Sequence, residues 1–430
     1  MTRAVRPARF GIRRPDFGVL ADRDYRQLFG ATAASQFGFH ITLLALPLAA
    51  ILALNATEFE AGLVYALMNA AFLLIGLPAG AWLDRTRRRP VMVAGDLARA
   101  ALLLSVPVAW WAGSLTLIHL YVVSFLFGIF TVLFDVAYQS YLPQLVGRQR
   151  LVEANARLES VRALAQVSAP GLGGYLVQLL TAPVALLANA VAMAASSLLI
   201  LRIRKPEPAS PRSGSTRLLA DIAEGLRFVL GHSLLRPIAV CTATVNLFLS
   251  IYLAMLTFFL ARDLALPEGQ IGLIMSVAGA GSVVGALVAR RFSAWVGHGP
   301  AIWLSAALGS PFALLMPLAQ PDWRVWLGAA GLLVTFGAAV VYNVAQVSLR
   351  QAVTPDRLLG RMNATMRFLV WGTLPLGGVL GGLFGDWFGS RTTLVVGALG
   401  ATLAFLPVLL SPLRGMRTVP DHLIPEPRQA

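Results

Sequence analysis

Residues 78–100 read PAGAWLDRTRRRPVMVAGDLARA, and this stretch gathers charge in a sequence that is only 13% charged. Five arginines and two aspartates lie within it, and apolar runs flank it on both sides. The arginines at 85–89 fit a loop between two apolar helices. Asp96 and Arg99 do not fit a loop, because they lie inside the apolar run that follows. The stretch therefore raises two questions: which way the loop faces, and what two charges do inside a helix.

The composition of the whole chain indicates a membrane protein. Of its 430 residues, 57% are hydrophobic, which exceeds the share usual in soluble domains. A helix needs about 20 apolar residues to cross the hydrocarbon core of a bilayer. Runs of that length recur along the chain, whereas a transmembrane barrel would show short alternating segments. We therefore predict an all-α membrane protein with the lipid bilayer as its surroundings.

Twelve apolar runs are long enough to be transmembrane helices. They are residues 27–54, 60–83, 90–112, 115–138, 158–181, 183–203, 236–261, 270–291, 300–320, 324–348, 361–388 and 390–412.

The basic residues predict the orientation of these helices. If the N-terminus is cytoplasmic, all 35 lysines and arginines lie on the cytoplasmic side except Arg262, Arg324 and Arg391. Such a bias is typical of cytoplasmic loops. We therefore expect a multi-pass protein of the bacterial inner (plasma) membrane with both termini cytoplasmic. The net charge of +15 is spread over separate loops without interleaved aromatics, so nucleic acid is not expected as a partner.

A long polar break divides the chain near its middle, at residues 204–235. It predicts a first bundle over 1–203, with a basic cytoplasmic tail, and a second over 236–413, followed by a cytoplasmic tail over 414–430. The linker contains TRLLADIAEGLRFVLGH, whose spacing of apolar residues predicts an amphipathic helix. This helix would lie either on the inner membrane surface or packed against the bundle.

The two halves of the chain repeat each other at an offset of 208 residues. FDVAYQS, which begins at Phe134, aligns with YNVAQVS, which begins at Tyr342. Further along, residues 172–174 and 380–382 both read LGG. One fixed offset over 40 residues predicts two related six-helix bundles, an arrangement typical of transporters that bind their substrate between the bundles.

The loop in the opening stretch resembles a motif of the major facilitator superfamily, which reads G-x-L-A-D-R-x-G-R-R. Five of its residues match in this chain, and we refer to them as the loop motif: Gly80, Asp84, Arg85, Arg88 and Arg89. Arg87 replaces the usual glycine. The resemblance implies the twelve-helix fold of that family and a gating role for the motif, with Asp84 held at a helix N-terminus of the other half. The alternative is that the arginines only fix the orientation.

A second motif lies in the fifth predicted span, where SAPGLGGYL resembles the antiporter motif G-P-x-x-G-G of the same family. Pro170, Gly173 and Gly174 match, while Ala169 replaces the first glycine. The functional interpretation is a seal against leakage, and the alternative is close helix packing. The sequence of residues 134–160 resembles that of the branch that contains macrolide-efflux and enterobactin-exporter proteins.

Charges inside the predicted spans form the next set of candidates. Asp96 and Arg99 share one helix face, because they lie three residues apart. An unpaired charge within the bilayer is costly, so each needs a partner. Asp135 reaches a similar depth from the fourth span, and we predict it as that partner and, with Asp96, as a proton carrier. A static charge network between helices is the alternative.

Polar residues near the middle of the spans are candidates for lining a substrate cavity. His40 lies about midway along the first span, where it either titrates during transport or bonds a neighbouring helix. The complete set is Gln36, His40, Asn69, Asn246 and Asn343.

These observations predict a secondary active transporter that exports amphipathic small molecules, such as drugs, macrolides or siderophore-like compounds, in exchange for protons. A solute importer or facilitator of the same fold is the alternative, because glycines of the antiporter motif are missing. An integral membrane enzyme ranks far behind, since no catalytic motif appears, and the lack of a P-loop argues against ATP as the energy source. We expect a monomer, with no cofactor and no metal.

Overall fold

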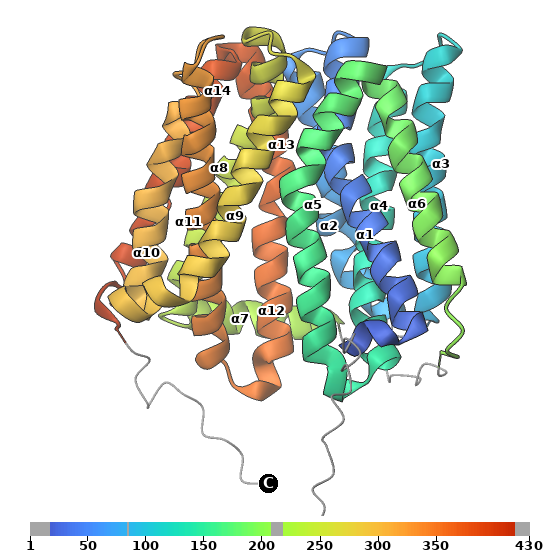
Figure 1. Cartoon of the computed structure of the whole chain (residues 1–430). Helices are drawn as coiled ribbons and strands as arrows, with labels where there is room; N and C mark the ends of the chain where they lie inside the picture. Colours follow the sequence, from blue (N-terminus) through green and yellow to red (C-terminus); the bar gives the residue numbers. More distant parts are fainter. Residues whose placement is uncertain (1–17, 84–85, 208–217, 418–430) are drawn as a thin grey trace, which may run out of the picture.

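The computed structural model describes residues 18–83, 86–207 and 218–417, which form a bundle of long helices lying side by side (Figure 1). The first half contains α1 (Arg23–Leu48), α2 (Glu58–Leu83), α3 (Arg88–Trp111), α4 (Leu117–Val146), α5 (Leu151–Leu180) and α6 (Ala182–Leu201). After α7 (Leu218–Gly231), the second half contains α8 (Leu235–Phe258), α9 (Glu268–Val296), α10 (His298–Gly309), α11 (Arg324–Ala352), α12 (Asp356–Trp371), α13 (Thr373–Phe388), α14 (Ser390–Leu403) and α15 (Leu406–Leu409).

The helices confirm an all-α membrane protein with twelve transmembrane helices. Among the described residues, ten helical stretches are long and apolar enough to cross a membrane. The other two are α5, whose first half is charged, and α10, which continues into the 3-10 helix η5 (Ser310–Leu315).

Several predicted spans differ from single straight helices. Residues 300–320 change from α to 3-10 helix at Ser310, directly before Pro311, which has no N–H to donate to the preceding turn. Residues 361–388 form α12 and α13, which meet at Gly372. The last span is divided between α14 and α15. By contrast, α5 continues through Pro170 without a break.

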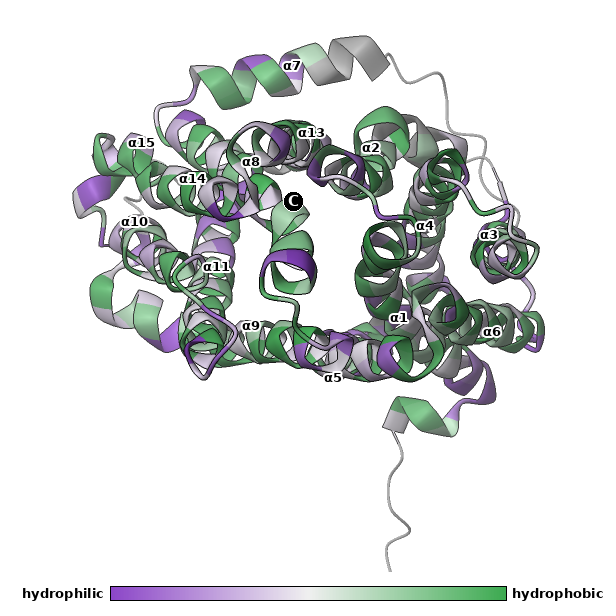
Figure 2. Ribbon diagram, turned by 90° about the horizontal axis from the view of Figure 1, so that it is seen from above, coloured by the Kyte–Doolittle hydropathy of each residue, from purple (hydrophilic) through white to green (hydrophobic). Residues whose placement is uncertain are grey.

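Each half packs as its own bundle. In the first half, α1 packs on α5 and α6, and α3 packs on α4 and α6; in the second, α8 packs on α13 and α14, and α9 packs on α11. Between the halves, the main contacts are α5 with α9 and α2 with α13. In Figure 2, α5 lies beside α9 and α2 lies beside α13, and these two pairs join the halves.

Two π-helical turns interrupt the bundle at related places. They are η2 (Ala49–Ala53) after α1 and η4 (Phe259–Asp263) after α8. Each is followed two residues later by a residue with positive φ, Asn55 at 52° and Ala265 at 47°. The repeat inferred from sequence therefore extends to irregular backbone.

Helix α7 lies across the end of the bundle at which α1 begins, and outside the ring of transmembrane helices (Figures 1 and 2). It packs against α12: a Cβ on Gly225 would lie 2.9 Å from the carbonyl oxygen of Arg361. The Glu224 carboxylate also pairs with the Arg361 guanidinium. Val229 is fully buried. Of the two predicted positions for this helix, the structure therefore favours packing against the bundle.

Candidate functional site

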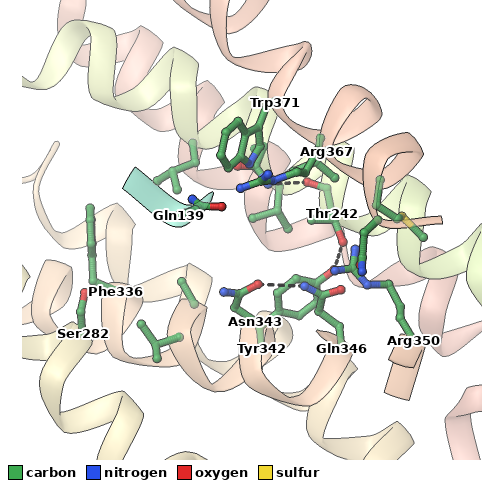
Figure 3. A pocket seen from close by; sticks show the side chains of 18 residues that line it. Gln139, Thr242, Ser282, Phe336, Tyr342, Asn343, Gln346, Arg350, Arg367 and Trp371 are labelled. Carbon is green, nitrogen blue, oxygen red and sulfur yellow. Dashed lines mark hydrogen bonds between the residues drawn. The ribbon is translucent and has the colours of Figure 1, made fainter. Parts of the chain in front are cut away.

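A cavity of about 560 Å³ is lined by Gln139 of α4 in the first half and otherwise by residues of α8, α9, α11 and α12 in the second half (Figure 3). Its walls mix polar amides with aromatic and aliphatic side chains. The residues labelled in Figure 3 are Gln139, Thr242, Ser282, Phe336, Tyr342, Asn343, Gln346, Arg350, Arg367 and Trp371. A mainly apolar pocket with a few polar groups is typical of small-molecule sites.

Some of the polar groups in the cavity already bond to one another. The Gln346 amide donates to the Asn343 side-chain oxygen over 2.8 Å. The hydroxyls of Thr242 and Tyr342 lie 2.5 Å apart. The two arginines differ from these residues, because the side chain of neither Arg350 nor Arg367 forms an ion pair or a hydrogen bond with a described residue.

A second cavity of about 320 Å³ adjoins the first and contains Asp135. The two cavities share Gln139, Asn363, Arg367 and Trp371. Asp135 is contributed by α4 in the first half, while Arg367 is contributed by α12 in the second. The carboxylate and the guanidinium therefore lie on opposite walls of one continuous space.

At the end where α2 begins, the halves touch through glycine. A Cβ on Gly62 of α2 would lie 2.7 Å from Cα of Gly382 on α13. In the same way, a Cβ on Gly272 of α9 would lie 3.0 Å from Cα of Gly174 on α5. Gly174 and Gly382 are equivalent under the 208-residue repeat, so one backbone contact occurs twice. Small residues allow membrane helices to approach this closely.

Polar contacts reinforce closure at this same end. Arg262, in η4, donates to the Ile51 carbonyl over 2.5 Å and to the Asn55 side chain over 2.7 Å. The Phe59 N–H donates to the Asp386 carboxylate over 2.9 Å. All three bonds cross from one half to the other.

Among the described residues, the contacts that close the space between the halves reach as far as the middle of the bundle. There the Gln166 amide donates to the Ser282 hydroxyl over 3.1 Å, and the rings of Phe72 and Trp371 lie 4.7 Å apart. Beyond them, Gln139 and Arg367 are exposed on facing walls. The cavity is therefore closed toward the start of α2 and open toward the end at which α1 begins.

Asp96 and Arg99 of α3 bond to each other and to neighbouring helices of the first half. Asp96 and Arg99 are 0% and 1% exposed, and the Arg99 guanidinium donates to the Asp96 carboxylate. The Ser196 hydroxyl of α6 donates to the other Asp96 oxygen over 2.5 Å. Arg99 also donates to the Ser35 hydroxyl of α1 over 3.3 Å and lies 4.6 Å from the Phe134 ring of α4.

This network corrects the predicted partner of the α3 charges. Arg99 pairs with Asp96 on its own helix, while Asp135 lies on the cavity and forms no hydrogen bond or ion pair with any described residue. The physical reason is that the Arg99 guanidinium reaches Asp96 one turn earlier on its own helix, and the Phe134 ring of α4 lies against it. The predicted static network is therefore present, but it joins α3 to α1, α4 and α6.

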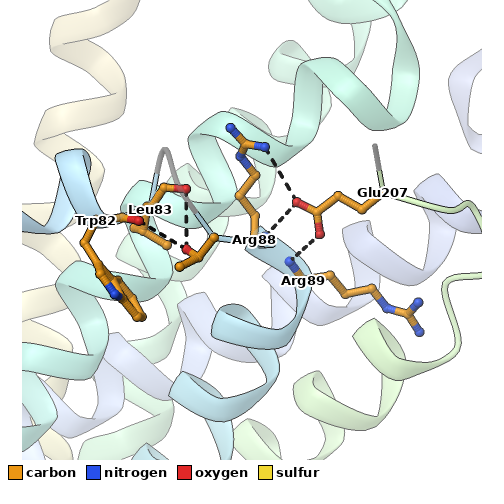
Figure 4. Close-up of polar contacts among 6 residues, drawn as sticks. Trp82, Leu83, Arg88, Arg89 and Glu207 are labelled. Atoms are coloured by element: carbon orange, nitrogen blue, oxygen red, sulfur yellow. Dashed lines mark hydrogen bonds and ion pairs between the residues drawn. The ribbon is translucent and has the colours of Figure 1, made fainter. Parts of the chain in front are cut away.

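The described part of the loop motif also lies within the first half. The Arg88 and Arg89 backbone N–H groups donate to the two carboxylate oxygens of Glu207, over 2.6 and 3.1 Å (Figure 4). The Arg89 guanidinium donates to the Leu201 carbonyl over 2.6 Å. Both arginines thus hold the start of α3 to the end of α6. Asp84 and Arg85 lie outside the described residues, as does the side-chain environment of Gly80.

The predicted cavity residues are divided by the structure. Asn246 and Asn343 line the larger cavity. Gln36, His40 and Asn69 line neither of the two cavities described above. The Asn69 amide donates to the Tyr65 carbonyl one turn earlier, over 2.8 Å.

The antiporter-like motif lies on the closed interface. A Cβ on Gly272 would lie 2.3 Å from the Pro170 carbonyl oxygen, and Gly174 faces the same turn of α9. Gly173 instead faces Ile41 of α1, within its own half. Both predicted interpretations, a seal and close packing, therefore remain compatible with the position of the motif.

Sequence reasoning missed most of the residues that line the larger cavity, and among the missed residues are Gln139, Arg350 and Arg367. The signal for Arg367 was present, because it lies inside the predicted span 361–388 and had been counted only toward orientation. Gln139 gave a weaker signal, as it lies one turn after Asp135 on the same helix face. Arg350 lies near the end of α11, where an arginine normally indicates only the membrane boundary.

Two facing helical bundles around a central cavity, closed at one end, define a multi-pass transporter of the alternating-access class. The model of the Major Facilitator Superfamily matches residues 28–375 and 238–428. The chain belongs to this family, which is a family of transporters and not of enzymes.

Comparison with characterised proteins gives two kinds of relatives. The multidrug efflux pump Tap of Mycolicibacterium fortuitum is 29% identical over 402 residues, which cover 89% of this chain and 95% of that protein. The enterobactin exporter EntS of Salmonella paratyphi A is 28% identical over 344 residues, covering 79% of this chain and 80% of that protein.

Solved structures share the fold at low sequence identity. The nucleoside transporter NupG has a TM-score of 0.74 at 14% identity, covering 90% of this chain and 98% of that chain. A bacterial homologue of the iron transporter ferroportin, in an inward-facing state, has a TM-score of 0.73 at 16% identity, with the same coverage. These likenesses support the fold alone.

Proposed function

We propose that this protein is a secondary active exporter, which takes amphipathic small molecules from the cytoplasm and is driven by protons moving inward. The observation that carries the proposal is the cavity between the halves, open at one end and closed by backbone contacts at the other. The similarity to a multidrug efflux pump and an enterobactin exporter supports export.

The direction in which the cavity opens depends on the orientation in the membrane. We infer that both chain termini lie in the cytoplasm of a bacterium, because only Arg262, Arg324 and Arg391 among 35 basic residues would face outside. The open end, at which α1 begins, then faces the cytoplasm, and Arg262 closes the outer end. Since one chain supplies both walls of the cavity, we expect the monomer to be the working unit.

Among the predicted proton carriers, Asp135 fits the role better than Asp96. Asp135 lines the cavity and therefore has access to protons from the open end. Asp96 is fully buried and already bonded to Arg99 and Ser196. A carboxylate that exchanges protons with one side at a time is what coupling by alternating access requires.

Gating would then exchange one set of contacts for another. The glycine contacts and the Arg262 bonds at the outer end must separate, while the cytoplasmic ends of α4, α5, α11 and α12 come together. Asp84 of the loop motif remains our candidate for a contact made only when the cytoplasmic end is closed.

The first test measures coupling in inside-out vesicles that have been acidified by ATP-driven pumping. Addition of a transported compound from a panel of drugs and siderophores is expected to dissipate part of the proton gradient. The variant Asp135→Asn is expected to bind the compound and yet release no protons. Asp322→Asn, which alters an exposed carboxylate in an exposed segment, serves as the matched control and should behave as the wild type.

The alternative function is a solute importer or facilitator of the same fold. It predicts substrate movement without any proton flux, or uptake into right-side-out cells. Either result across the whole panel would contradict coupled export, and wild-type proton release by Asp135→Asn would exclude Asp135 as the carrier.

A further inference from the structure

Two arginines and no carboxylate occur among the described residues that line the larger cavity. Arg350 is 8% exposed, and its buried Nε has no hydrogen-bond partner. Figure 3 places its guanidinium beside Tyr342 and Gln346, at one end of the cavity. Arg367 also lines the cavity, and its guanidinium lies 4.8 Å from the centre of the Trp371 ring. The positive charges of Arg350 and Arg367 are therefore not balanced by any acidic residue among those that line the larger cavity.

An unpaired guanidinium in a buried position, as at Arg350, is costly. The side chain of Arg367 is exposed to the cavity instead. Guanidinium presents up to five N–H donors in a planar fork, which suits the paired oxygens of a carboxylate, a sulfonate or a phosphate. Neither arginine uses this fork on a described residue. The donors of Arg350 and Arg367 are therefore available to a ligand that enters from the open end.

We propose that the transported molecule carries an oxyanion, which binds at Arg350 and Arg367, and an aromatic body, which packs against Trp371 and Phe336. The proposal rests on the proposed function only in taking this cavity as the substrate site. It adds the chemical class of the substrate, which neither the fold nor the general term amphipathic specifies.

Asp135 on the opposite wall indicates what the other end of the substrate carries. Asp135 faces Arg367 across the shared space and belongs to the first half. If substrate and proton exclude each other at Asp135, the substrate brings a positive group, such as a protonated amine, toward that carboxylate. The cavity then selects zwitterionic aromatic compounds, with the anion toward the second half and the amine toward the first.

A set of four naphthalene probes tests this arrangement. One probe bears a sulfonate, one an aminomethyl group, one bears both at opposite ends, and one bears a neutral carboxamide. Binding is measured to the purified full chain in nanodiscs of phosphatidylcholine. The sulfonate is expected to bind about tenfold more tightly than the carboxamide, a difference typical of one charge-assisted contact.

Substitutions assign this preference to residues. Arg350→Gln and Arg367→Gln should each remove most of the tenfold advantage of the sulfonate, while binding of the carboxamide stays unchanged. Asp135→Asn should remove only the gain from the aminomethyl group. Arg236→Gln is the matched control, because Arg236 is an exposed arginine that lines a separate cavity between α8 and α15.

Three outcomes would overturn the proposal. The first is equal affinity for all four probes, and the second is equal loss of carboxamide and sulfonate binding in the arginine variants. The third is loss of sulfonate binding when phosphatidylglycerol is added to the nanodiscs, which would assign the arginines to a lipid headgroup. Any of these, together with continued proton-coupled efflux, would leave the proposed function standing and remove only the substrate class.

Discussion

At the scale of single residues, Asp96 and Arg99 show how a membrane helix accommodates two charges. Both side chains are buried. Besides their mutual ion pair, Asp96 accepts a hydrogen bond from Ser196, and Arg99 donates to Ser35 and lies over the Phe134 ring. These three contacts come from α1, α6 and α4, which are three other helices of the first half. The pair therefore holds α3 to the other helices of that half, and neither residue lines either of the two cavities.

We expect Arg99→Ala to lower the free energy of unfolding by about 3–5 kcal/mol, because it leaves the Asp96 carboxylate buried without its counter-charge. The measurement is thermal or denaturant unfolding of the purified protein in detergent. Arg162→Ala is a suitable control, since the Arg162–Glu159 pair is exposed and its N–O distance is 3.8 Å; its effect should stay below about 1 kcal/mol. Similar losses in both variants would refute the role of burial.

At the scale of helices, the contact between the two halves at the end where α2 begins is made by two helix crossings, and in each crossing a glycine lies against a glycine. The helices α2 and α13 meet at Gly62 and Gly382, and the helices α5 and α9 meet at Gly174 and Gly272. In both crossings, backbone touches backbone without an intervening side chain. Such contacts form and separate as a unit, because no flexible side chain can adjust to a partial opening.

Gly62→Ala should therefore hinder closure of the outer end and favour the outward-open state. Its added Cβ would meet backbone atoms of Gly382 at 2.7 and 2.8 Å, so one helix must shift. We expect transport to fall at least about fivefold, a change of roughly 1 kcal/mol in the conformational equilibrium. Distances between spin labels on the outer ends of α2 and α13 measure the shift.

Gly231, the last residue of α7, provides the control for that experiment. A Cβ at Gly231 would meet no atom within 4 Å, and Gly231 lines neither cavity, so Gly231→Ala should leave both the distances and transport unchanged. Unchanged label distances in Gly62→Ala would show that the crossing tolerates a side chain, and that the glycines are not required for closure.

At the scale of the whole molecule, the main contacts between the two halves, among the described residues, lie in the middle and at the end where α2 begins. Polar bonds there come from chain segments far apart in sequence, as in the pairing of Arg262 with Ile51 and Asn55. Helix α7 lies across the other end, outside the ring, and packs on α12 and α8 of the second half (Figure 1). Movement of α12 during transport must therefore carry α7 with it.

Arg262→Ala should shift the equilibrium between the two end states. It removes two hydrogen bonds of a charged donor, each contributing about 1–2 kcal/mol, so the outward-open population should rise roughly tenfold or more. Accessibility of a single cysteine placed in the outer half of the cavity to a membrane-impermeant reagent reports this population. Arg324→Ala, which breaks an ion pair with Asp322 within the second half, should leave accessibility unchanged.

Much of the fold could be predicted from sequence, because length, hydropathy and the 208-residue repeat are properties of the chain itself. The breaks at Pro311 and Gly372 were missed, since an apolar run looks continuous in composition even where its backbone hydrogen bonding changes. The site was predicted in part: Asn246, Asn343 and Asp135 line the cavities, but the partner of Arg99 was wrong. Depth along a helix can be counted from sequence, whereas the direction of a side chain depends on its neighbours, as Phe134 shows.

The uncompensated arginines of the cavity also imply a response to voltage. Arg350 and Arg367 exceed the single carboxylate Asp135 by one positive charge, and by two once Asp135 is protonated. Each elementary charge that crosses the full membrane field contributes about 2.3 kcal/mol per 100 mV. In the proposed orientation and with the proposed proton coupling, an interior-negative potential would therefore favour the cytoplasm-facing state of the empty, protonated protein. In an energised cell, most of the resting protein would then have its cavity open to the compartment that supplies the substrate.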